Sequence, residues 1–167
     1  GRHYEALLPA SVGDHQAAGS GENPARLGYV EIATGAVREM RAGDVGLATG
    51  YVLRFSNGLV AYLSGDTGIM ADHELVVRGH YGAKLAVMNI GDGFTTGPAE
   101  AAYVINDLIK PASVIASHAN EVATAGGKVR PGSKTDSFMK AVKAPVHIPL
   151  SGRTMEFDGA GKCTAGC

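Results

Sequence analysis

The chain has 167 residues, of which 45% are hydrophobic and 19% are charged, and its formal net charge is −1. This composition is typical of one globular domain with a hydrophobic core, and it excludes an intrinsically disordered chain. The charge is balanced and aromatic residues make up 6%, which argues against nucleic acid as the main partner. No apolar run approaches a membrane span. We expect a soluble protein, and the sequence does not decide between a cytoplasmic and a periplasmic compartment.

The first third of the chain has few regular signals. Residues 4–9 are typical of a strand, and the irregular stretch that follows, from residue 10 to about residue 49, is rich in glycine and alanine. Two apolar-alternating runs then occupy 51–55 and 59–64, and the Asn57-Gly58 pair between them is a strong hairpin signal. We therefore predict a β-hairpin whose second strand leads directly into a Gly-Asp-Thr-Gly turn at 65–68.

Helices and strands alternate in the rest of the predicted chain. The expected elements are a helix at 71–81, a strand at 84–90, a helix at 98–110, a strand at 113–117, a helix at 133–142, and two closing strands at 145–149 and 153–157 turned at Ser151-Gly152. Pro98 suits the first helical position and Pro111 ends that helix. A strand-rich start followed by alternating β and α elements predicts an α/β or α+β layered fold.

Two candidate metal ligands stand at predicted strand ends. Asp66 lies on the glycine-flanked turn after the hairpin, and His118 follows the strand at 113–117. A carboxylate and an imidazole are suitable ligands for zinc or a similar divalent ion, and the two oxygens of Asp66 could bridge two ions. Each residue also has a structural interpretation, an Asx turn for Asp66 and a satisfied core or surface histidine for His118. The pair on successive α/β units favours a site.

A glycine-rich loop between the strand at 84–90 and the helix at 98–110 invites a nucleotide-binding interpretation. Its glycines, Gly91, Gly93 and Gly97, are spaced one residue away from the dinucleotide fingerprint. The following strand ends in His118 and not in an acidic residue, and no Gly-Lys-Ser/Thr sequence is present. We interpret the loop as a wall of an active site.

Several other polar residues have open or modest roles. Cys163 and Cys167 could close a small disulfide loop or supply part of a metal site, and the interpretation we favour is a frayed tail. His73 could line a cleft, whereas His80 and His147 are expected to be structural or exposed. Basic residues gather in the loop after His118, as a solvated loop or as contacts for an anionic substrate group: Lys128, Arg130 and Lys134.

Three stretches together resemble a known family. They are residues 50–72 with the Gly-Asp-Thr turn, residues 88–98 with Ala101, Ala102 and Tyr103, and residues 114–118 ending in His118. In this order the sequence is similar to the C-terminal half of metallo-β-lactamase-fold hydrolases, most of all to the branch that includes L-ascorbate-6-phosphate lactonase. The resemblance covers roughly residues 50–157 and implies half of an αββα sandwich.

The resemblance implies roles for three residues. In that family the aspartate that matches Asp66 bridges two metal ions and orients the catalytic water, and the histidine that matches His118 holds the second ion. His15 matches a later family segment weakly and would ligate the first ion. The expected cofactor is a pair of divalent ions, Zn²⁺ or alternatively Mn²⁺.

The His-x-His-x-Asp-His signature of that family is absent from this sequence. We therefore expect residues 1–167 to form a single but incomplete domain, completed by an N-terminal half or by a second copy of the chain. The predicted function is hydrolysis of an ester, lactone or phosphoester bond in a small-molecule substrate by metal-activated water. The alternative is a non-catalytic half-domain or assembly partner, and a nucleotide-binding domain rests on the glycine loop alone.

Overall fold

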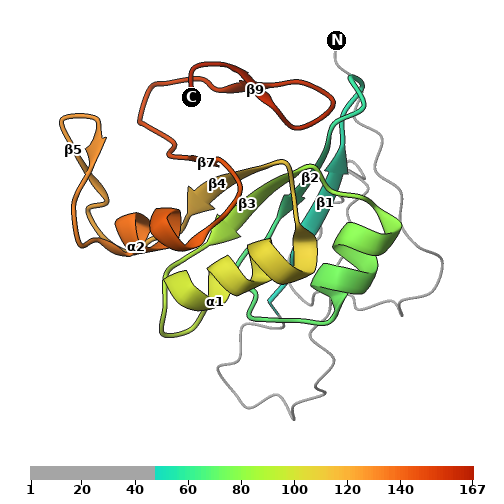
Figure 1. Cartoon of the computed structure of the whole chain (residues 1–167), viewed down its shortest axis with the longest axis horizontal. Coiled ribbons are helices and arrows are strands. Elements are labelled where there is room, and N and C mark those ends of the chain that lie inside the picture. The colour runs from blue at the N-terminus through green and yellow to red at the C-terminus, as the bar shows by residue number, and fades with distance from the viewer. Residues whose placement is uncertain (1–47) are drawn as a thin grey trace, which may run out of the picture.

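The computed structural model describes residues 48–167. A five-stranded mixed sheet forms its centre, in the order β1-β2-β3-β4-β7 (Figure 1). Its strands are β1 (Tyr51–Arg54), β2 (Val60–Leu63), β3 (Leu85–Asn89), β4 (Ser113–Ser117) and β7 (Val146–His147). β1 and β2 are antiparallel and are joined through the predicted Asn57-Gly58 turn, whereas β2, β3, β4 and β7 run parallel. The predicted α/β layered fold class is confirmed.

Helices cover one face of this sheet (Figure 1). They are η1 (His73–His80), α1 (Pro98–Tyr103), which continues into η2 (Val104–Ile109), and α2 (Lys134–Ala141). The η segments have the wider π-type turn. Pro98 begins α1 as predicted, and the Glu100 side chain accepts a hydrogen bond from the Gly97 N–H at 2.9 Å, which satisfies one of the unpaired donors at this helix start.

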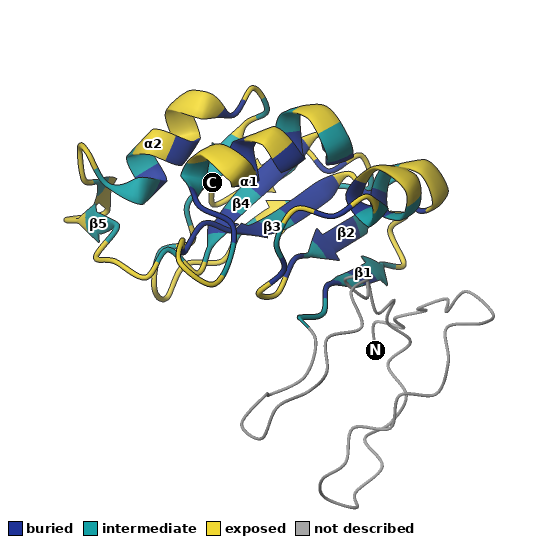
Figure 2. Ribbon diagram, turned by 90° about the horizontal axis from the view of Figure 1, so that it is seen from below, coloured by how far each residue is buried: buried dark blue, intermediate teal, exposed yellow. Residues whose placement is uncertain are grey.

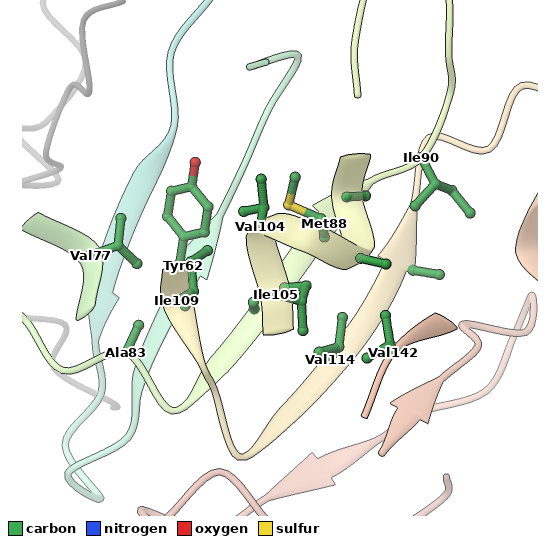
Figure 3. Close-up of a cluster of buried hydrophobic side chains, with 14 of the residues drawn as sticks. Tyr62, Val77, Ala83, Met88, Ile90, Val104, Ile105, Ile109, Val114 and Val142 are labelled. Atoms are coloured by element: carbon green, nitrogen blue, oxygen red, sulfur yellow. The ribbon is translucent and has the colours of Figure 1, made fainter. Parts of the chain in front are cut away.

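The main core lies between the helices and the sheet. Tyr62, Met88 and Val114 on the strands meet Val104 and Ile105 on the central helix, and all five are at most 1% exposed (Figure 3). The buried strands and the outward, exposed helix surfaces are seen from another side in Figure 2. Tyr62, Ala86 and Val114 are register partners on neighbouring strands, so they lie side by side on the face that the helices cover. This agrees with the alternation of side chains between the two faces of a strand.

The opposite face of the sheet carries a smaller cluster. Leu59, Ala61 and Leu85 are buried there, and Phe157 from the C-terminal segment packs against them. Phe157 belongs to a hairpin formed by β8 (Glu156–Phe157) and β9 (Cys163–Ala165). In Figure 1 this segment runs along the side of the sheet away from the helices.

The C-terminal segment differs from its prediction. The strands expected at 145–149 and 153–157 do not pair with each other, since β7 joins the main sheet beside β4 and β8 pairs with β9. The tail is not frayed, because β9 is a strand and Cys163 and Cys167 form a disulfide. A second small hairpin, β5 (Thr124–Ala125) with β6 (Lys128–Val129), occupies part of the predicted loop after His118.

Predictions for the first 47 residues lie outside the described residues. These are the strand at 4–9, most of the irregular stretch that follows it and the candidate ligand His15. Among residues 48–167, no helix combines the length and the apolar character needed to cross a bilayer.

Candidate metal centre

Three neighbouring parallel strands end at one edge of the sheet, and each leads to polar residues. β2 leads to the turn that carries Asp66, β3 ends in Asn89, and β4 is followed by His118. In open α/β sheets, ligands bind outside the carboxyl ends of the strands, where side chains from several loops converge. This edge is therefore the natural place for a site.

Asp66 and His118 are in direct contact at this edge. The distance from His118 Nδ1 to Asp66 Oδ1 is 2.7 Å, although 52 residues separate them in sequence. Both side chains remain accessible, with 62% of Asp66 and 39% of His118 exposed. A contact between two accessible side chains of this kind contributes little to stability.

A buried hydrogen-bond network fixes the Asp66 turn. The Asn89 amide group donates to the main-chain carbonyls of Gly65 at 2.7 Å and Thr67 at 3.0 Å, on either side of Asp66. It also donates to Ser64 Oγ at 3.1 Å, and Thr96 bonds to the Asn89 side-chain oxygen. Asn89 is 1% exposed, so the network is shielded from water and strong. The network thereby fixes the main chain from which the Asp66 side chain projects.

Backbone strain gathers around the same edge. His118, Asn120 and Asp92 have positive φ angles of 48°, 52° and 68°, a region that residues other than glycine enter at a free-energy penalty. The backbone at Gly91 lies very close to the residues that follow β4. A Cβ atom at Gly91 would lie 2.7 Å from the His118 carbonyl oxygen and 2.8 Å from Asn120 Nδ2. Strained residues that cluster in this way are a recognised mark of functional sites.

The start of α2 braces this edge from outside. The Lys134 ammonium donates to the carbonyl oxygen of Gly91. Glu121, three residues after His118, accepts from the Thr135 N–H at 3.0 Å. Lys134 is therefore engaged in holding the loop, whereas Lys128 is exposed on the β5–β6 hairpin. Of the basic residues in question, Lys128 therefore lies on a solvated hairpin, whereas Lys134 lies at the start of α2.

His73 does not line a cleft. It is fully buried behind the Asp66 turn, where its Nδ1 accepts from the Met70 N–H at 3.3 Å and its Nε2 lies 2.9 Å from the Tyr62 hydroxyl. The hydrogen bonds place the ring proton on Nε2, which makes His73 a neutral donor to Tyr62. Burial lowers the pKa of His73 to about 4 and raises the pKa of Tyr62 to about 12. His73 thus supports the turn from within the core.

The donor set fits part of a divalent metal site. A carboxylate and an imidazole on a solvent-facing edge have the chemistry that zinc prefers. Zinc sites in proteins use three or four protein ligands, and within residues 48–167 no further His, Cys, Asp or Glu completes a set of three around Asp66 and His118. A third ligand would have to come from outside the described residues, where His15 lies.

The sequence predicted the two possible ligands but missed what positions them. Asn89, Ser64 and Thr96 carry no motif of their own, because an amide and two hydroxyls in a strand and a loop are common in any protein. The signal that was present is a polar residue, Asn89, at the end of an otherwise apolar strand. A buried polar residue at that position calls for partners, and the neighbouring strand end supplies them.

No family model matches the chain. A protein of Polynucleobacter asymbioticus named UPF0173 metal-dependent hydrolase is 30% identical over 107 residues, which are 64% of this chain and 36% of that protein. A protein of the same name from a Polaromonas species is 38% identical over 68 residues, 41% of this chain and 24% of that protein. This chain therefore spans about a third or less of the length of these relatives.

A solved structure has a similar fold. Igni18, described as a metallo hydrolase from the archaeon Ignicoccus hospitalis, matches 87% of this chain and 58% of its own chain, with a TM-score of 0.52 and 20% identity. Similarity at this level of identity shows a shared fold and no more.

Proposed function

We propose that this chain supplies part of the active site of a metal-dependent hydrolase, with Asp66 and His118 as two of its metal ligands. The observation that carries the proposal is the 2.7 Å contact between these two accessible side chains at the carboxyl edge of the sheet. The similar proteins are named metal-dependent hydrolases, which supports the same chemistry. The proposed reaction is cleavage of an ester, lactone or phosphoester bond in a small molecule, with two Zn²⁺ ions, or Mn²⁺, as the cofactor.

Each residue of the edge has a defined task in this proposal. Bound divalent ions would supply a polarised, more acidic water and an electrophile for the substrate oxygen. Asp66 would bridge the ions, since Oδ1 already faces His118 and the carboxylate has a second oxygen. His118 would hold one ion through its ring, and Asn89 would keep the Asp66 turn from moving when the ion binds.

The remaining ligands define the proposed partner. We expect them from His15, from an N-terminal half of the sandwich or from a second copy of this chain. The face of the sheet opposite the helices, which in a two-half sandwich would meet the other half, has several partly exposed apolar side chains: Leu53, Leu63, Val87 and Ile115. An intact-mass spectrum of the purified sample, taken after denaturation, tests whether a second polypeptide accompanies the chain.

The direct test combines metal content with activity. The purified protein, with its Cys163–Cys167 disulfide intact, is loaded with Zn²⁺, desalted, and assayed for bound metal and for hydrolysis of a panel of esters, lactones and phosphoesters. Asp66→Asn keeps the size of the side chain but removes its charge, so we expect both metal and hydrolysis to be lost. Asp107→Asn, an exposed aspartate on η2, is the matched control and should retain both. Unchanged metal content and rate in Asp66→Asn would remove Asp66 from the mechanism.

The non-catalytic alternative keeps one observation in its favour. The described residues bring only two suitable ligands together at this edge, and two ligands hold zinc weakly. If the wild-type protein binds no metal at this edge and hydrolyses none of the substrates, the chain is better described as a structural or assembly partner.

A further inference from the structure

A second group of potential metal ligands lies on the other face of the sheet. One ligand atom from each of His147, Cys163 and Cys167 lies within 4.8 Å of the others. His147 ends β7, and the two cysteines belong to the C-terminal hairpin and the residues after it. None of the three takes part in the Asp66–His118 site.

The fold builds this group through Phe157. Phe157 is the register partner of Cys163, and its ring packs edge-on against the His147 ring, with centroids 5.5 Å apart. Phe157 also contacts the apolar cluster of Leu59, Ala61 and Leu85, which anchors the hairpin to the sheet. The cysteines are therefore brought to His147 by core packing and not by chance contact of a loose tail.

The backbone at Gly166 returns Cys167 to the same place. Gly166 has φ +75°, and a Cβ atom there would lie 1.9 Å from the Thr154 carbonyl oxygen. Only glycine fits this close approach. Cys167 lines a pocket of about 470 Å³ together with Ile148, Leu150 and Arg153.

The imidazole of His147 has a buried nitrogen atom, Nε2, without a hydrogen-bond partner among the described residues. A buried polar atom without a partner is unfavourable and calls for an explanation, such as a bound ion or water.

We propose that His147, Cys163 and Cys167 form a redox-controlled site for a zinc-type ion. Two thiolates and a neutral imidazole are ligands that zinc binds well, and a fourth position would be filled by water or another solute. In the structure the two cysteines form a disulfide, which has no thiolate to offer. The oxidised chain therefore cannot hold the ion in this way, whereas the reduced chain can.

The exchange between the two states is balanced. Two equivalents of a small thiol reduce the Cys163–Cys167 disulfide, giving two protein thiols and one small-molecule disulfide. Binding of Zn²⁺ then displaces two protons from the thiols and forms two metal–sulfur bonds. Oxidation reverses the sequence and releases the ion.

The test uses the complete chain with Asp66→Ala and His118→Ala, so that the first site cannot contribute. The protein is reduced with a phosphine under argon and titrated with Co²⁺, a spectroscopic substitute for zinc. We expect a thiolate-to-cobalt charge-transfer band in the near ultraviolet, which carboxylate and imidazole ligands do not produce. After exchange into Zn²⁺ and desalting, the reduced protein should retain one ion per chain and the disulfide form none.

Variants separate the three ligands from the fold. Cys163→Ser with Cys167→Ser should abolish the charge-transfer band. His147→Gln should weaken Zn²⁺ binding on the order of tenfold or more, since even loss of an outer-shell partner has effects of that size. His80→Gln, an exposed histidine on η1, is the matched control and should bind as the parent does. Circular dichroism of each variant identifies any loss of folding.

Two results would overturn the proposal. The first is a reduced, folded protein that retains no more Zn²⁺ than its Cys163→Ser/Cys167→Ser variant. The second is a His147→Gln variant that is folded and binds with unchanged affinity, which would remove the imidazole from the site. Neither result depends on hydrolysis, so the proposed function can fail or hold independently.

Discussion

Asn89 fixes the turn that carries Asp66 in the candidate metal centre. It has no role in chemistry, yet its side-chain amide donates to the backbone on both sides of Asp66. Because the main chain around Asp66 is fixed before an ion binds, less conformational entropy is lost when the ion binds.

Replacement of Asn89 by Asp should harm both stability and metal binding. The change removes a donor and places carboxylate oxygens against the carbonyl oxygens of Gly65 and Thr67. We expect a loss of about 1–3 kcal/mol in the free energy of unfolding, measured by urea denaturation, together with weaker Zn²⁺ binding. Asn106→Asp, at an exposed pair of hydrogen bonds near α2, is the control. A loss no larger than in the control would show that the network does not support the turn.

His73 makes stability depend on pH in a defined window. Burial lowers its pKa to about 4, whereas histidine in the unfolded chain has its ordinary pKa of 6.5. Above pH 6.5 His73 is unprotonated in both the folded and the unfolded chain, and the folded protein has its full stability with respect to this residue. Between pH 6.5 and 4 only the unfolded chain takes up the proton, so the free energy of unfolding falls by about 1.4 kcal/mol per pH unit, about 3 kcal/mol in all.

The pH prediction is tested by comparing the parent protein with a variant that lacks His73. Urea denaturation of the parent and of His73→Gln, each from pH 7.5 to 4, separates His73 from other titrating groups such as His147, whose pKa burial also lowers. The parent should lose more stability than the variant over this range. Parallel curves for the two proteins would contradict the assignment of a neutral, buried His73.

At the scale of elements, the loop between β3 and α1 is fitted tightly against the residues after β4. Gly91→Ala would place a methyl group 2.7 Å from the His118 carbonyl oxygen and 3.0 Å from Thr95 Oγ1. The loop must move away to relieve this contact. We expect weaker metal binding at the Asp66–His118 edge, measured by Zn²⁺ retention, with the sheet still folded by circular dichroism.

Gly79→Ala provides the comparison for that variant. Gly79 lies on η1, where the added methyl group would meet the Glu74 carbonyl oxygen at 3.2 Å and no atom of the residues after β4. Equal Zn²⁺ retention in the two variants would show that close packing at Gly91 is unimportant to the site.

The elements with strong periodicity could be predicted from the sequence, and the short ones could not. The hairpin at Asn57-Gly58, the strand at 113–117 and the helix beginning at Pro98 were all confirmed, because each rests on a local signal. β7, β8 and β9 have two or three residues each and take their partners from distant parts of the chain. Local patterns do not contain that information.

One missed hairpin did have a local signal. β5 and β6 are joined by Gly126 and Gly127, both with positive φ, and a Gly-Gly pair between short runs favours this kind of turn. For the candidate site, the strand-end positions of Asp66 and His118 could be read from the sequence. The proximity of His147 to the cysteines could not, because it depends on the C-terminal segment crossing the far face of the sheet.

At the scale of the whole molecule, the two faces of the sheet are covered unequally. Helices bury most of one face, whereas on the other face the C-terminal segment packs on the smaller cluster around Phe157. Leu63, Val87 and Ile115 on that second face remain partly exposed. Contiguous apolar surface of this kind is typical of a face that meets another polypeptide.

We therefore predict that the chain does not behave as an isolated monomer. Light scattering at low concentration should give a mass above the 17.1 kDa of one chain. Val87→Arg, near the centre of the second face, should lower that mass, whereas Leu75→Arg on the exposed side of η1 should not. A stable, folded monomer for the parent protein would refute the expectation of an incomplete domain.

The positive φ of His118 creates a conflict between stability and metal binding. The left-handed conformation disfavours histidine, whereas metal binding requires its imidazole. Selection for thermal stability alone, in a library that varies residues 92, 118 and 120, should favour glycine or asparagine at each, because these residues enter the left-handed region most readily. Selection for zinc capture should restore histidine at 118 in spite of the strain. Positions where the two selections diverge would mark the active site of such a protein without any knowledge of its substrate.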